Sequence, residues 1–209
     1  LTTSQFSGVT STQIGELSPS QIDAVTININ GLTTTQLGGL TPTQMGDLDG
    51  ETFATLSSVQ VAGLTTTQIS GLKSSAILGI TTAQLSSLTS TQLAALNPEE
   101  IEFTTTQVMN LTPAQLSGFV RQRFSGLDTT IAVVLSSTQL GALTETQIAG
   151  LSSTAFSVLD ATQLSGLTST QFAALRATQL NALSTTGVAS LEVTAQLSGL
   201  TSTQIASLN

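Results

Sequence analysis

The stretch Leu32-Thr33-Thr34-Thr35-Gln36-Leu37-Gly38-Gly39 contains the pattern that decides the fold. It reads apolar–[Ser/Thr]–x–[Ser/Thr]–Gln–apolar–x–small. We count 26 such units over residues 1–209, those at Val25 and Leu96 one residue short and that at Leu191 one residue long. Units begin at Leu1, Val9, Leu17 and Val25, at every eighth residue from Leu32 to Leu96 and from Phe103 to Leu191, and at Leu200. A period this regular predicts a solenoid.

Each unit carries the start signals of a very short helix. The four prolines, Pro19, Pro42, Pro98 and Pro113, all stand at its third position. Proline is favoured at the first position inside a helix, and Ser or Thr is favoured just before it as the N-cap. Thr-x-x-Gln forms a capping box, and apolar first and sixth positions form a hydrophobic staple. The unit therefore predicts a helix that begins at its third position.

The eighth position predicts how each helix ends. It is often glycine, the residue expected just after a helix, where the φ angle becomes positive. The glycines concerned are Gly8, Gly39, Gly63, Gly71, Gly150 and Gly166.

Two other backbone conformations compete with the short helix. A continuous helix fails because eight residues turn the apolar face by about 80° per repeat, so no apolar stripe persists. A β-solenoid remains the alternative, because Thr, Ile and Val favour strands. It needs a turn inside each unit, since the first and sixth side chains would otherwise face opposite ways. The third-position prolines and fifth-position glutamines have no evident part in it.

We therefore expect an all-α superhelical solenoid of very short capped helices, one per eight-residue repeat. Helices of five or six residues are unstable alone, so the units must stack around a Leu/Ile/Val/Phe core. We expect Ser, Thr, Gln, Gly and Ala outside. The 209 residues form one such domain, a segment of a longer array or a stacking protomer. Because no clear period above eight is seen, the number of octads per coil stays open.

The composition excludes several classes of function. The net charge is −8, and the only cations are Lys73, Arg121, Arg123 and Arg176, too few to follow a phosphate backbone. We therefore expect no nucleic-acid partner. The longest apolar run, Ile131 to Leu135, is too short to cross a bilayer, so we expect no membrane span. The sequence starts in phase with the repeat and without Met, which favours a processed product or a segment.

Catalytic chemistry is scarce in this sequence. It has no Cys and no His, so the common nucleophile–base pairs are excluded, and we expect no enzyme and no cofactor. One acidic group, Asp47, Asp49 and Glu51, resembles the start of a calcium loop but lacks the glycine that should follow the fifth position. These three residues are the candidate metal site. The alternative is that Asp49 replaces Thr as an N-cap.

The octads Leu88-Thr-Ser-Thr-Gln-Leu-Ala-Ala and Leu143-Thr-Glu-Thr-Gln-Ile-Ala-Gly resemble a known kind of repeat. They are similar to the LTTxQ-type octapeptide arrays of large, Cys-poor, acidic secreted bacterial surface proteins, often called adhesin-like. The resemblance covers the whole chain, with departures near Val25, Leu96, Phe119 and Leu191. It implies an extracellular or cell-surface location and a structural or adhesive role. It provides no functional residue to carry over.

Two functions follow as expectations. The first is a structural extracellular repeat protein, the rod, stalk or filament of a bacterial surface or adhesive assembly. Its uncapped solenoid ends would expose apolar side chains and favour end-to-end self-association. The second is a Thr-rich binding module for ice or polysaccharide, with contact to a surface or glycan. It uses recurrent hydroxyl pairs such as Thr33/Thr35, although in a helix the first of each pair bonds to its own backbone.

Overall fold

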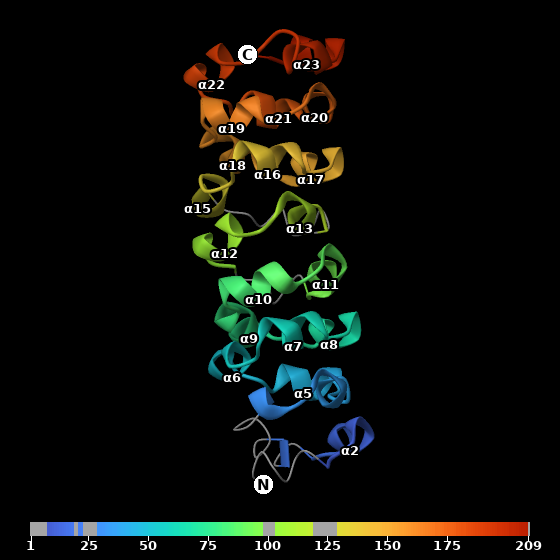
Figure 1. The fold of residues 1–209 in the computed structure, drawn as a ribbon. Helices are drawn as coiled ribbons and strands as arrows, with labels where there is room; N and C mark the ends of the chain where they lie inside the picture. Colours follow the sequence, from blue (N-terminus) through green and yellow to red (C-terminus); the bar gives the residue numbers. More distant parts are fainter. Residues whose placement is uncertain (1–7, 19–20, 23–28, 98–102, 119–128, 209) are drawn as a thin grey trace. The chain divides into compact units, whose positions relative to one another are not determined.

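The computed structural model describes residues 8–18, 21–22, 29–97, 103–118 and 129–208. These residues form 20 short α-helices and two 3₁₀-helices, and the described ranges contain no strand (Figure 1). The prediction of an all-α solenoid of short helices is therefore confirmed, and the β-solenoid alternative is wrong for this part of the chain. The chain divides into two compact units, Leu1–Asn110 and Leu111–Asn209, and each is described by itself.

Unit 1 contains a helix in almost every described octad. Its elements are α2 (Ser11–Gly15), η1 (Ile29–Gly31), α4 (Thr34–Leu37), α5 (Pro42–Gly46), α6 (Gly50–Ala54), α7 (Ser58–Ala62), α8 (Thr66–Ser70), α9 (Ser74–Gly79), α10 (Thr82–Ser87), α11 (Ser90–Ala95) and α12 (Thr105–Met109). Unit 2 continues the pattern. Its elements are α13 (Pro113–Ser117), α15 (Thr129–Ala132), α16 (Ser137–Gly141), α17 (Glu145–Gly150), α18 (Ser153–Ser157), α19 (Ala161–Ser165), α20 (Ser169–Ala173), α21 (Ala177–Leu180), α22 (Thr185–Ala189), η3 (Leu197–Gly199) and α23 (Ser202–Ala206).

Three octads make one coil of the solenoid. In unit 1, α5 packs on α8, α6 on α9 and α7 on α10. In unit 2, α16 packs on α19, α17 on α20 and α18 on α21. Each helix thus lies against the helix three octads later, and within each unit the helices form three columns (Figure 1). The coil therefore repeats about every 24 residues, a number that the octad alone did not provide.

The predicted capping boxes are present. At α8, Thr65 has extended backbone angles (φ −73°, ψ 158°), and its Oγ1 accepts a hydrogen bond from the Gln68 backbone N–H at 3.2 Å. The Thr65 N–H donates in return to Gln68 Oε1 at 3.0 Å. Pro42 and Pro113 each begin a helix, as their phase predicts, while Pro19 and Pro98 lie outside the described residues. Each start that carries this box therefore satisfies two backbone donors that a helix leaves unpaired.

The first and sixth positions of the octad fill the core. Ile69, at a sixth position, is 0% exposed, and Leu72, at the next first position, is 1% exposed. Phe53, Phe156 and Phe172 are the largest fully buried side chains among the described residues. Because each buried aliphatic side chain contributes roughly 1.5–3 kcal/mol, a stacked coil can stabilise helices that are too short to form alone.

All described glutamines except Gln13 and Gln21 are buried, so their predicted place on the outside is wrong. Gln68 is only 3% exposed, and its Nε2 donates to the carbonyl oxygens of Leu37 at 2.7 Å and Leu40 at 2.9 Å. Leu37 is the last residue of α4, and Leu40 lies just before the N-cap of α5, both in the preceding coil. We call these bonds the glutamine ladder. Such bonds also start from Gln36, Gln44, Gln60, Gln84, Gln92, Gln107, Gln139, Gln147, Gln163, Gln171, Gln179, Gln196 and Gln204.

The long unit at Leu191 keeps its glutamine in spite of the extra residue. Gln196 stands one place later than usual, yet its Oε1 accepts from the Glu192 N–H at 2.7 Å. Its Nε2 lies 3.3 Å from the Leu167 carbonyl oxygen in the preceding coil. The insertion is absorbed by a turn and η3 in place of an α-helix.

The glycines at the eighth position do not adopt positive φ, so that prediction is wrong. No described glycine has a positive φ; Gly71, for example, ends α8 at φ −82° and ψ −13°. The chain leaves the helix through an ordinary helical residue followed by an extended one. At Gly71 the reason for glycine is close packing between coils, because a Cβ there would lie 2.2 Å from the Pro42 carbonyl oxygen. Gly39 and Gly166 meet Ser11 and Ser137 in the same way.

We predict that Gln68→Glu lowers the free energy of unfolding by about 2–4 kcal/mol, more than Thr65→Ala, which should cost about 1 kcal/mol. A glutamate can still accept the N-cap hydrogen bond, so the capping box survives. The carboxylate cannot donate to the Leu37 and Leu40 carbonyls, which leaves buried acceptors unpaired. Urea denaturation followed by circular dichroism measures both variants. Equal stability of Gln68→Glu and wild type would show that capping is the only role of this glutamine.

We predict that Gly71→Ala costs about 1–3 kcal/mol, because its Cβ would meet backbone atoms of the neighbouring coil. Gly63→Ala is the matched control. Gly63 ends α7 with nearly the same angles (φ −79°, ψ −8°), but outside its own helix a Cβ there would meet the Thr34 Cγ2 methyl, at 3.3 Å, instead of backbone. We expect this control to stay within about 0.5 kcal/mol of wild type. Thermal melting measures the stability of both variants. Similar losses of stability in Gly71→Ala and Gly63→Ala would contradict the packing explanation.

Candidate functional site

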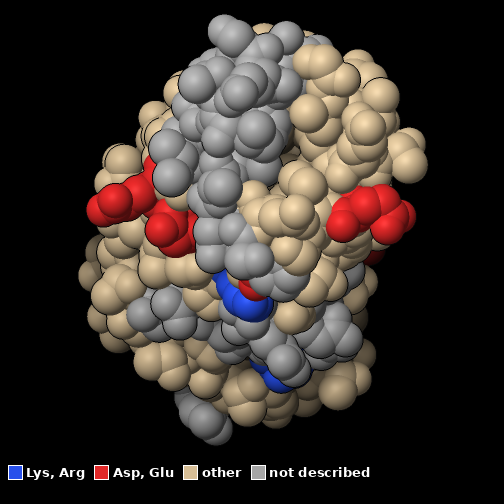
Figure 2. Space-filling view, turned by 90° about the horizontal axis from the view of Figure 1, so that it is seen from below, with Lys and Arg blue, Asp and Glu red and all other residues tan. Residues whose placement is uncertain are grey.

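Charged side chains are sparse on this protein. Most of the described residues on the face seen in Figure 2 are uncharged, and acidic side chains lie at separate places on it. The ion pair found among the described residues joins Lys73 Nζ to Asp47 Oδ1 at 3.7 Å, and both side chains are well exposed. An exposed pair of this kind contributes little to stability. The described surface is therefore mostly uncharged.

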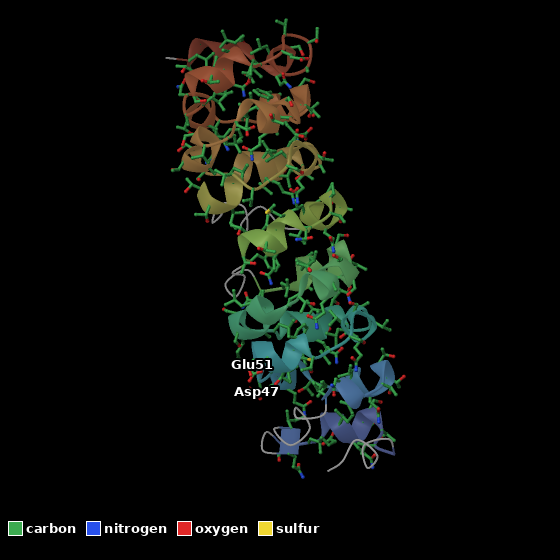
Figure 3. The ribbon with its side chains drawn as sticks, turned by 60° about the vertical axis from the view of Figure 1, so that its left-hand side comes forward. Asp47 and Glu51 are labelled. Carbon is green, nitrogen blue, oxygen red and sulfur yellow. The ribbon has the colours of Figure 1, made fainter. Side chains whose placement is uncertain are left out.

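The structure assigns separate local roles to the three residues of the candidate metal site. Asp47 ends α5 and pairs with Lys73, and Asp49 is the N-cap of α6. Glu51 lies in the first turn of α6, and Figure 3 shows it on the same side of unit 1 as Asp47. The described residues contain no group of three or more His, Cys, Asp or Glu side chains placed to hold a metal ion. These three carboxylates are thus neighbours in sequence without forming a coordination shell.

Asp49 acts as the alternative prediction describes. Its Oδ1 accepts a hydrogen bond from the Thr52 backbone N–H at 2.8 Å. That bond, together with hydrogen bonds from the Thr52 side chain and the Glu51 backbone, holds the pKa of Asp49 below its usual value. The charged form is therefore the form that caps α6.

The hydroxyl groups form two sets. Those at the second position, such as Thr65 Oγ1, are used in capping boxes, as the sequence predicts. Those at the fourth position are exposed, and in unit 2 they recur as threonine in successive octads. The exposed set comprises Thr138, Thr146, Thr154, Thr162, Thr170, Thr178 and Thr186. The hydroxyls of this second set are exposed without being part of a capping box.

A shallow groove lies between α17 and α20. Its lining residues are Gly141, Leu143, Thr144, Glu145, Thr168, Thr170 and Gln171. Thr168 Oγ1 and Thr170 Oγ1 lie 3.1 Å apart and share a hydrogen bond. The groove combines hydroxyls with one carboxylate, which is the kind of surface that polar ligands such as sugars contact.

The last described coil, made of α22, η3 and α23, exposes the acceptors of the glutamine ladder. In inner coils the carbonyl at the first position accepts from the glutamine three octads later wherever that octad has one, as Leu175 accepts from Gln204 at 2.7 Å. Within the described chain, no side chain donates to the equivalent carbonyls of Leu183, Leu191 and Leu200. Val188 and Ile205 are 52% and 57% exposed there, although sixth-position residues are buried in inner coils. We call these five residues the acceptor face.

The first described coil exposes the opposite half of the ladder. Gln13 and Gln21 accept the N–H groups of Thr10 and Ser18 through Oε1, each at 2.9 Å. Both side chains are exposed, and no described residue accepts a hydrogen bond from either Nε2. Val9 and Leu17, at first positions, are only half-buried. We call these four residues the donor face; sequence reasoning missed its amides because it assigned glutamine a capping role alone.

Comparison with known proteins adds no relative to this picture. The sequence matches no model of a known protein family, and no curated protein is significantly similar to it. None of the helices in the described ranges has the length and hydropathy that a bilayer span requires.

We predict that Asp49→Asn is less stable than wild type near neutral pH, because it keeps an N-cap but loses the charge at the N-terminus of α6. The folded-state pKa of Asp49 is lowered, so its contribution is present above the unfolded pKa of about 3.9 and is lost as the pH falls through the folded pKa. The two melting temperatures should therefore converge in acid. A difference that is independent of pH would contradict the charge explanation.

The calcium candidate is tested with the same two proteins. Because the three carboxylates do not converge on one point, we expect calcium to leave both melting temperatures unchanged. A rise with calcium concentration in wild type that is absent in Asp49→Asn would establish the site.

Proposed function

We propose that the chain is a structural, non-enzymatic protein that works outside a bacterial cell as part of a rod, stalk or filament. The observation that supports this most is the identity of successive coils. Each inner coil receives glutamine bonds on its carbonyls and sends glutamine bonds to the coil before it. Such a coil can be added to another coil of the same kind indefinitely, so length becomes a property that the sequence can set by repetition.

The composition and the buried hydrogen bonds of the chain suit an extracellular setting. The chain has no Cys and few charged side chains, and its helices are held by buried amide–carbonyl bonds that salt screens weakly. The resemblance to secreted octapeptide arrays supports the same location. The role is therefore to span distance or to carry other parts of a surface assembly.

A second candidate is a binding module for polysaccharide or ice. The exposed fourth-position threonines of unit 2 and the groove between α17 and α20 favour it. Measurement of thermal hysteresis tests ice, and a glycan array tests polysaccharide. A matched variant with Thr138, Thr154 and Thr170 changed to Ala should lose any activity found, because these side chains are exposed and their removal leaves the core intact.

The proposed location and role predict where the protein is found. Antibodies raised against the 209-residue chain should label intact source cells, with gold particles on the surface or along extracellular fibres in electron micrographs. The same antibodies absorbed with purified chain provide the control. Label that appears only after the cells are permeabilised would contradict the proposal.

A further inference from the structure

We propose that two copies of this chain bind head to tail, with the donor face of one copy on the acceptor face of the next. The inference deepens the proposed structural role and rests on it, because it names the partner that continues the array. In a longer polypeptide, further octads would cover the same faces. For the 209-residue chain in solution, the occupant is a second copy.

The hydrogen-bonding groups of the two faces are complementary. The donor face offers two amides, Gln13 Nε2 and Gln21 Nε2, on successive octads. The acceptor face offers carbonyl oxygens on successive octads, at Leu183, Leu191 and Leu200. Inside each unit the same two kinds of group meet, as Gln171 meets Leu143 at 2.6 Å and Gln44 meets Leu17 at 3.0 Å. Each face thus presents the groups with which the other is paired inside the solenoid.

The apolar side chains of the two faces are also more exposed than their equivalents in inner coils. Val188 and Ile205 are 52% and 57% exposed, whereas Ile148 and Leu164, at the same octad position, are each 0% exposed. Val9 and Leu17 are half-buried, whereas Leu40 at the same position is 3% exposed. Contact between the faces would restore the inner-coil environment for both sets. Burial of these side chains supplies the attraction, and the glutamine bonds set the register.

The contact is heterologous, because the two faces are different surfaces. A heterologous contact that does not close into a ring propagates, so association should continue beyond the dimer. We therefore expect the average mass of the wild-type chain to rise steadily with concentration.

Two variants test the two faces separately. Gln13→Glu/Gln21→Glu removes the donors but keeps the capping boxes. Because these Nε2 groups donate to nothing in the single chain, its melting temperature should not change, unlike that of Gln68→Glu. Val188→Glu/Ile205→Glu places charge on the acceptor face, where the native side chains are already more than half exposed. Each change should raise the dissociation constant at least about tenfold.

A third variant controls for added negative charge. Thr138→Glu/Thr162→Glu places two carboxylates in the first turns of α16 and α19, at exposed side chains away from both faces. It should associate as wild type does. Sedimentation velocity with interference optics suits all four proteins, because the chain has no Trp or Tyr.

Mixing the donor-face and acceptor-face variants distinguishes a defined head-to-tail contact from general aggregation. The donor-face variant still has a native acceptor face, and the acceptor-face variant still has a native donor face. Alone, each should stay monomeric at concentrations where wild type assembles; mixed, they should form a one-to-one dimer and nothing larger. A wild-type chain that stays monomeric, end variants that assemble like wild type, or a mixture without dimer would each overturn the inference. None of these results would affect the surface labelling that tests the proposed function.

Discussion

The fold depends on one side-chain amide that makes two kinds of bond at once. In Gln68, Oε1 accepts the N-cap N–H of its own helix, and Nε2 donates to two carbonyls of the preceding coil. Helices of four to six residues have too few internal bonds to be stable, so each needs both a closed N-terminus and a neighbour. The amide supplies both because it has an acceptor and a donor, whereas glutamate would supply only the first.

The fold also requires neighbouring coils to lie close together, because a glutamine side chain bonds only to a carbonyl within hydrogen-bond distance. Glycine at the eighth position lets one helix touch the first residue of the helix before it in the column, as Gly71 does with Pro42. In the column of α6 and α9 the octads lack glutamine, and there Gly50 and Gly79 meet backbone to backbone. Small residues and buried amides are thus two parts of the same packing solution.

Local features were predictable from the sequence, and contacts between coils were not. The capping boxes, the N1 prolines and the buried first and sixth positions follow from the residues of a single octad. Glycine was assigned a positive φ because its real reason, the proximity of another coil, is not local. A longer period was nevertheless present in the first 123 residues, where glutamine is missing from the fifth position at Ile29, Thr52, Ala76, Glu100 and Arg123, spaced by 23 or 24 residues. The later gaps, at Ile131, Ala155, Gly187 and Ala195, do not continue this spacing. The irregular residues 23–28, 98–102 and 119–128 lie outside the described structure.

The donor and acceptor faces connect this packing to function, because the bonds that hold one coil to the next can also hold one protein to the next. The most direct test of the central claim is the solvent exchange rate of glutamine side-chain amide protons, measured by NMR on the whole chain below its association range. Our account predicts that the Nε2 protons of Gln68 and Gln84, buried and doubly bonded, exchange at least as slowly as helix amides. The exposed Nε2 protons of Gln13 and Gln21 should exchange rapidly. Equal, fast exchange at all four glutamines would contradict the account.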